Sequence, residues 1–72
     1  MTKILIICKN EEIFTSDEKN VEIMKNEIII QNSVELLENS QYRYKQLPFL
    51  IQKTDIIQMM IVKIYRTINF EE

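Results

Sequence analysis

Side chains for acid–base or nucleophilic catalysis are scarce in this 72-residue sequence. It has no histidine, the commonest general base, and no glycine, on which the common phosphate-binding loops depend. A Ser-His-Asp or Cys-His constellation therefore cannot be assembled within one chain. One cysteine without histidine also excludes the standard structural zinc sites. We expect no cofactor, no metal and no enzymatic activity.

The remaining reactive groups are adjacent carboxylates and one thiol. The pairs Glu11/Glu12 and Asp17/Glu18 are typical of solvated turns. Paired catalytic carboxylates would need a cleft, which a core of this size hardly provides. Cys8 ends an apolar run, where burial raises the pKa of a thiol. We expect Cys8 to be buried and unreactive.

Aromatic and basic side chains alternate in residues 41–46. On an extended strand, Tyr42 and Tyr44 share one face, and Arg43 and Lys45 share the other. The simplest arrangement has the tyrosines facing the core and the cations facing water. A protein-binding patch is the first functional interpretation, since Tyr and Arg are enriched at interface hot spots. Single-stranded nucleic-acid binding is the second, with rings stacked on bases and cations on phosphates.

Charged residues are distributed unevenly along the chain, whose formal net charge is −2. Residues 1–40 have four lysines against eight carboxylates, whereas residues 41–66 have five cations against Asp55 alone. We therefore expect an acidic side and a basic side. Lys63 and Arg66 join the tyrosine segment as candidates for partner binding. The nucleic-acid interpretation uses all the cations of the basic half: Arg43, Lys45, Lys53, Lys63 and Arg66.

The densest apolar segment is residues 55–70, against which the rest of the chain is expected to pack. On a helix, which turns by about 100° per residue, Met60 and most isoleucines of this segment fall on one arc. Thr54 would be the N-cap of this helix. From Val62 to Phe70 the residues also alternate as in a strand, and many are β-branched. The helix is the preferred interpretation and the strand is the alternative.

The preceding residues predict strands. Residues 3–8 form a continuous apolar run that is typical of a strand covered on both faces, and residues 13–15 a short return strand. In the absence of glycine, asparagine best tolerates positive φ at turns. Four asparagines separate segments of strand length: Asn20, Asn26, Asn32 and Asn39. This spacing favours a hairpin over residues 20–31, turning at Lys25-Asn26, rather than a long helix. Ser33 is expected to cap one helical turn over residues 34–37.

These elements predict one small domain over residues 1–72, of the α+β class. A small antiparallel or mixed β-sheet, built from residues 3–8, 20–31 and 41–52, would be covered by the C-terminal amphipathic helix. The alternative is an all-β small barrel or sandwich in which residues 56–66 form the last strand. A chain this short buries only about 60% of its unfolded surface. Its composition is 46% hydrophobic, which leaves apolar surface for a partner.

The function we expect is that of a non-catalytic protein-binding module acting on a larger host protein or complex. The frequent isoleucine and the absence of alanine and glycine are typical of an A/T-rich genome. An inhibitor or accessory factor encoded by a phage or mobile element fits this composition, and a homodimer is a further expectation. The alternatives are a nucleic-acid-binding module and a small structural subunit of an assembly.

The expected compartment follows from the cysteine content and the apolar runs. A single cysteine cannot form an internal disulfide, which indicates a reducing cytoplasm. No stretch approaches the roughly 20 apolar residues of a membrane span, so no membrane partner is expected.

Overall fold

The structure is a computed structural model that describes residues 2–63. These residues form two antiparallel sheets. The larger sheet contains β1 (Thr2–Cys8), β2 (Ile13–Asp17), β5 (Ser33–Leu36), β6 (Tyr42–Lys45) and β8 (Ile56–Lys63). The smaller contains β3 (Val21–Ile23), β4 (Glu27–Ile30) and β7 (Phe49–Gln52). Three 3₁₀ turns, η1 (Glu18–Asn20), η2 (Glu38–Ser40) and η3 (Lys53–Asp55), connect consecutive strands.

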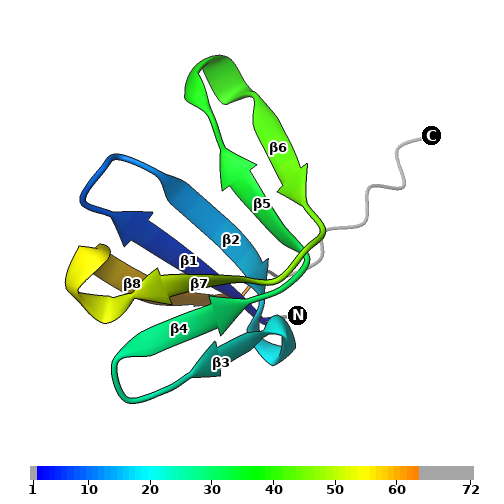
Figure 1. Ribbon diagram of the computed structural model, residues 1–72. Coiled ribbons are helices and arrows are strands. Elements are labelled where there is room, and N and C mark those ends of the chain that lie inside the picture. Colours follow the sequence, from blue (N-terminus) through cyan, green and yellow to red (C-terminus); the bar gives the residue numbers. More distant parts are fainter. Residues whose placement is uncertain (1, 64–72) are drawn as a thin grey trace.

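The strand order is β6-β5-β2-β1-β8 in the large sheet and β3-β4-β7 in the small one. Figure 1 shows β1 beside both β2 and β8, with the β5–β6 hairpin at the other edge of the large sheet. The first and last described strands are therefore neighbours, although they are far apart along the chain.

The core lies between the two sheets, because alternate side chains of each strand point to the same side. Ile6 of β1 and Ile30 of β4 are completely buried, at 0% exposure. Cysteine and aliphatic residues of both sheets, together with one aromatic ring, complete the cluster: Ile4, Ile6, Cys8, Phe14, Ile28, Ile30 and Ile51. β1 thus has one fully buried face, while the side chains of its other face, including Ile7, are only partly buried.

The predicted α+β class is wrong, because residues 56–63 of the predicted helix form strand β8, and no helix covers a sheet within residues 2–63. β8 pairs antiparallel with β1, from Thr2 opposite Lys63 to Cys8 opposite Ile56. An apolar run of this length fits both the helical period and the strand period. The arc of apolar residues therefore did not distinguish a helix from a strand. The all-β alternative agrees with the structure as far as Lys63. The rest of the predicted helix lies outside the described residues.

Several local predictions are confirmed and one more is wrong. Strands occupy residues 3–8 and 13–15 as expected, and β3 and β4 form the hairpin with Lys25-Asn26 in its turn. Of the four asparagines expected to allow positive φ, Asn32 and Asn39 have φ angles of 47° and 61°, whereas Asn20 and Asn26 do not have positive φ. The predicted helical turn after Ser33 is strand β5 instead. Residues 41–52 form two strands, β6 and β7, that belong to different sheets.

The turn between β5 and β6 has two consecutive residues with positive φ, Asn39 at 61° and Ser40 at 62°. The N–H of Gln41 donates to the carbonyl of Glu38 at 3.3 Å and closes the turn. Two positive φ angles define a type I′ turn, in which glycine is strongly preferred at the second position. Ser40 occupies that position with a Cβ that crowds the backbone.

Ser40→Gly is expected to stabilise the fold by about 0.5–1 kcal/mol, because it relieves the left-handed conformation and gives the favoured Asn-Gly pair. Urea denaturation monitored by circular dichroism measures the change. Gln41→Gly is the matched control, since Gln41 has φ −86° and needs no glycine; it should destabilise. Equal effects of the two substitutions would contradict the turn assignment.

Candidate protein-binding surface

The large sheet has a second face, turned away from the small sheet. Directly opposed residues of antiparallel strands point to the same side, so the pairing register defines the rows that cross this face. One row is Met60-Leu5-Thr15-Val34-Tyr44, and the next is Gln58-Ile7-Ile13-Leu36-Tyr42. We call this surface the outer face. Its apolar members are Leu5, Ile7, Ile13, Val34, Leu36, Tyr42, Tyr44 and Met60.

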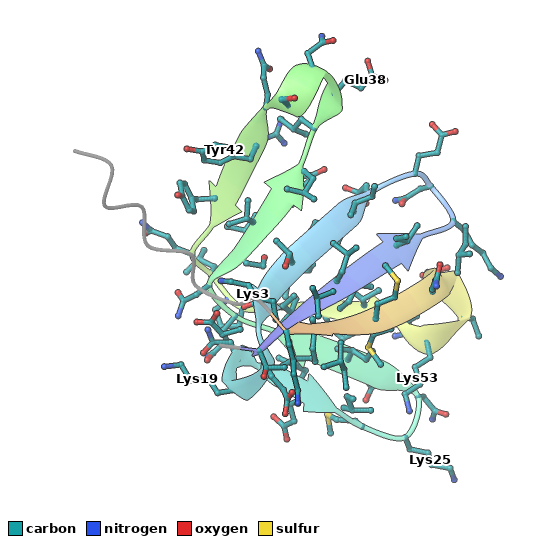
Figure 2. All side chains as sticks on the ribbon, turned by 180° about the vertical axis from the view of Figure 1, so that it is seen from behind. Lys3, Lys19, Lys25, Glu38, Tyr42 and Lys53 are labelled. Carbon is teal, nitrogen blue, oxygen red and sulfur yellow. The ribbon has the colours of Figure 1, made fainter. Side chains whose placement is uncertain are left out.

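The two tyrosines at one end of the outer face are its most exposed members. Tyr42 is 58% exposed and Tyr44 is 69% exposed. Their rings meet edge to face, with centroids 5.3 Å apart at an interplanar angle of 84°. Figure 2 shows Tyr42 projecting from the β5–β6 hairpin, away from the body of the molecule. The expectation that Tyr42 and Tyr44 face the core is therefore wrong.

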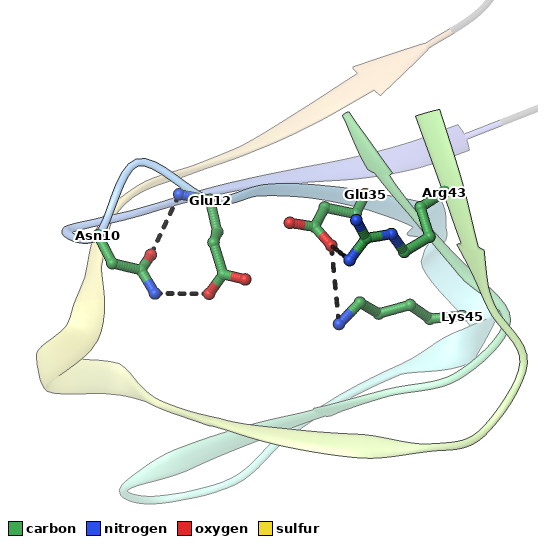
Figure 3. Close-up of polar contacts among 5 residues, drawn as sticks. All are labelled: Asn10, Glu12, Glu35, Arg43 and Lys45. Carbon is green, nitrogen blue, oxygen red and sulfur yellow. Dashed lines mark hydrogen bonds and ion pairs between the residues drawn. The ribbon is translucent and has the colours of Figure 1, made fainter. Parts of the chain in front are cut away.

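Arg43 and Lys45 point to the core side of the sheet, and Glu35 explains why. Glu35 lies opposite Phe14 on one neighbouring strand and opposite Arg43 on the other, so its side chain is on the core side. The Glu35 side chain is 9% exposed, and its Oε1 lies 3.7 Å from both Arg43 Nη1 and Lys45 Nζ (Figure 3). A buried carboxylate needs nearby cations. Because β6 alternates, directing its cations to Glu35 turns its tyrosines outward.

The alternation that reveals this arrangement is present in the sequence. In Ser33-Val34-Glu35-Leu36, polar and apolar residues alternate with the period of a strand. A helical turn over residues 34–37 would not place Glu35 beside Arg43 and Lys45, so this prediction missed the contact. Residues 42–45 form one strand, as predicted, but its tyrosines lie on the outer side and its cations on the core side.

Lys45 also lies over two aromatic rings, with Nζ 5.4 Å from the Phe14 centroid and 5.2 Å from the Phe49 centroid. These three residues line an open pocket of about 400 Å³ together with Cys8. Burial raises the pKa of the Cys8 thiol, and the charges of Glu12 and Asp55 raise it further. Cys8 is buried as predicted. The pocket offers room for an apolar group, but its thiol is held in the protonated, unreactive form.

The Glu11/Glu12 pair lies in the turn between β1 and β2. The Asn10 side chain donates to the Glu12 carboxylate and accepts from the Glu12 N–H at 3.1 Å, as Figure 3 shows. Glu11 is exposed and has φ 71°. This carboxylate pair therefore has the turn role that its sequence indicated.

The remaining basic candidates do not gather on one surface. Arg43 and Lys45 are on β6, whereas Lys63 ends β8 at the opposite edge of the large sheet. Four strand spacings, about 19 Å, separate these edges. Figure 2 shows Lys53 near Lys25, at one end of the small sheet. Arg66 lies outside the described residues. The cations predicted to form one basic side are thus dispersed.

Asp17 forms an ion pair with Lys3 at the margin of the outer face, with Nζ 2.8 Å from Oδ1. The hydrogen bond from Lys3 lowers the pKa of Asp17 below its ordinary value of 3.8. A carboxyl group with a lowered pKa stabilises the fold fully above the unfolded-state pKa. That contribution is lost as the pH falls through the folded-state pKa.

Asp17→Asn is therefore expected to lower the free energy of unfolding at pH 7, and its difference from wild type should shrink as the pH falls below 3.8 and through the lowered folded-state pKa of Asp17. Urea titrations at several pH values measure this difference. Lys3→Met should give the same profile, because it removes the other member of the pair. A difference that is constant from pH 7 to pH 2 would contradict the assignment.

The fold defines a small β-domain of two antiparallel sheets that enclose one core. Comparison of the chain with known protein families, with curated proteins and with solved structures finds no match. Among residues 2–63, no helical segment has the length and apolar character that a membrane crossing would need.

Proposed function

We propose that this chain is a non-catalytic protein-binding module and that the outer face of its large sheet binds an apolar surface on a larger host protein or complex. The observation that carries the proposal is the exposure of Tyr42 and Tyr44 beside the uncharged, largely apolar outer face. Tyrosine is enriched among the residues that dominate binding energy at protein interfaces. An exposed apolar patch of this kind is typical of an interaction site.

The charge of the outer face supports a protein partner. Its rows of opposed residues contain no charged side chain between Tyr42 and Gln58 or between Tyr44 and Met60. The one charged row at its margin is the Lys3–Asp17 pair, which is neutral as a unit. A nucleic acid needs cations next to the stacking rings. Here Arg43 and Lys45 lie on the other side of the strand and contact Glu35.

The biological role that fits these features is that of an inhibitor or accessory factor that acts by occupying a surface of its partner. The A/T-rich codon bias of the composition fits a phage or mobile element as the source, and a reducing cytoplasm suits its unpaired, buried Cys8. Such a role depends on shape and apolar contact, for which a small two-sheet domain is sufficient.

Tandem affinity purification of the tagged chain from its own cellular background tests the proposal. The double substitution Tyr42→Ser/Tyr44→Ser is expected to weaken binding of the purified partner at least tenfold, since hot-spot tyrosines contribute about 2 kcal/mol or more each. The matched control is Ile23→Ser/Leu50→Ser, which changes two residues of the small sheet that are 54% and 50% exposed. The control should bind like wild type.

Three outcomes would overturn the proposal. One is wild-type affinity of the double tyrosine variant, and another is equal loss in the control. The third is recovery of the chain without a protein partner but with salt-dependent affinity for single-stranded nucleic acid, which is the mark of phosphate contacts.

A further inference from the structure

Within residues 2–63, strand β8 has one edge that pairs with no other strand. It pairs with β1 on one side and is the last strand of the large sheet as described. It is eight residues long, and residues 56–62 contain no charge and no proline. Proteins normally protect sheet edges with short strands, charges or proline. The other edge strands have such protection: β3 has three residues, β7 has four and follows Pro48, and β6 has four with Arg43 and Lys45.

We propose that β8 pairs antiparallel with β8 of a second copy of this chain, about a twofold axis at Met59. The two large sheets then form one continuous sheet across the dimer. A strand paired antiparallel with an identical strand is self-complementary, as a twofold interface requires. The backbone N–H and C=O groups of the free edge provide the hydrogen bonds.

The two faces of the sheet restrict the register of this pairing. Directly opposed residues must come from the same face, because a shift of one residue would exchange the core side with the outer side. Met59 lies opposite Ile6 on the core side, and Met60 lies opposite Leu5 on the outer face. The twofold axis must therefore pass through a residue position and not between two residues.

The uncharged run of β8 selects one residue among these positions. Residues 56–62 carry no charge, and Met59 is their centre, so an axis at Met59 pairs this run with the same run of the second copy. An axis at Met60 would bring Lys63 level with Ile57. An axis at Gln58 would bring Ile61 level with Asp55, which belongs to η3 and not to the strand.

The apolar side chains of β8 favour the same arrangement. Ile57, Met59 and Ile61 are 65%, 38% and 66% exposed, although Met59 and Ile61 are on the core side of the sheet. The small sheet leaves this end of the core side open. With the axis at Met59, Ile57 lies opposite Ile61 of the second copy, so two exposed isoleucines cover each other at the interface.

This pairing uses a different surface from the protein-binding function proposed above. Tyr42 and Tyr44 are on β6, at the opposite edge of the large sheet from β8. The dimer would present two outer faces on one side of a continuous sheet. Experiments can therefore contradict the β8 dimer without contradicting the protein-binding function, and the reverse.

Sedimentation equilibrium and light scattering of the purified chain test the proposal. The protein concentration is varied from about 1 µM to about 1 mM, the range in which weak dimers dissociate. Wild type is expected to be dimeric, and Ile57→Lys/Ile61→Lys monomeric, with the dissociation constant raised at least 100-fold. Ile57→Glu/Ile61→Glu should also be monomeric. A mixture of the basic and acidic variants should form a heterodimer, which excludes misfolding as the cause. Ile23→Lys/Leu50→Lys is the matched control and should stay dimeric.

Oxidative cross-linking tests the register. Met59→Cys places a thiol opposite its own symmetry mate, within the distance that a disulfide spans. It should form a covalent dimer under mild oxidation. Ile61→Cys is more exposed but lies opposite Ile57, so it should cross-link at least tenfold less. The buried Cys8 of wild type provides the background.

A wild-type chain that is monomeric at the highest concentration would overturn the proposal. Dimers that persist in the Ile57/Ile61 lysine variant, or that disappear in the small-sheet control, would place the interface elsewhere and also overturn it. Equal cross-linking of Met59→Cys and Ile61→Cys would overturn the axis at Met59.

Discussion

Ile6→Ala is expected to destabilise the fold by about 2–5 kcal/mol, enough to unfold a large fraction of the molecules at 25 °C. Ile6 is 0% exposed and lies at the centre of β1, between the two sheets. The substitution removes apolar burial and leaves a cavity that flanking strands cannot easily fill. A chain of this size has a small stability margin. Urea unfolding followed by circular dichroism measures the loss.

Ile7→Ala is the matched control, because it makes the same chemical change at the next residue of the same strand. Ile7 is only partly buried, on the outer face, and we expect its loss to cost about 1 kcal/mol in the monomer. Conservative Ile6→Val should cost about 0.5–1.5 kcal/mol. Equal losses at Ile6 and Ile7 would mean that β1 is covered equally on both faces, which the structure does not show.

Lys45→Met is expected to destabilise the fold by about 1–3 kcal/mol, since it leaves the buried Glu35 carboxylate with Arg43 alone. It also removes the ammonium group that lies over the Phe14 and Phe49 rings. Arg43→Met should cost less. Both cations are 3.7 Å from Glu35 Oε1, but the Arg43 side chain is 63% exposed and that of Lys45 is 32% exposed. Water therefore screens the arginine pair more strongly.

The double variant Glu35→Leu/Lys45→Met completes the test. Replacing both members of a buried ion pair by apolar groups is often neutral or stabilising, so the double variant should be more stable than Lys45→Met alone. Urea unfolding of wild type, Glu35→Leu, Lys45→Met and the double variant gives the coupling energy. Purely additive effects, or an equal loss from Arg43→Met, would contradict the role of Glu35.

The strands of the first thirty residues could be predicted because local signals agree there. β1 is a continuous β-branched run, and the β3–β4 turn falls at Lys25-Asn26, between segments of strand length. Pairing between distant segments has no such signal. Nothing local indicates that β8 pairs with β1, or that β6 and β7 separate into different sheets, because these choices depend on which apolar faces pack together.

The candidate surface shows the same limit. The alternation of Tyr42, Arg43, Tyr44 and Lys45 correctly divides the strand into an aromatic face and a basic face. Which of the two faces of β6 is turned to water depends on Glu35, which belongs to the neighbouring strand β5. Tyrosine is usually more buried than lysine, but here the buried Glu35 carboxylate lies on the same side of the sheet as Lys45, and the two tyrosines are exposed.

The pairing of β1 with β8 has a consequence for how the chain is made. During synthesis, β1 leaves the ribosome before the other strands and can pair with β2 as soon as β2 follows. Its other edge must wait until Ile56 and the residues after it have been added. Sheets completed by such distant strands fold slowly, in roughly milliseconds to seconds. The nascent chain therefore carries an open, isoleucine-rich strand throughout translation, and this interval is when capture by a chaperone would matter most.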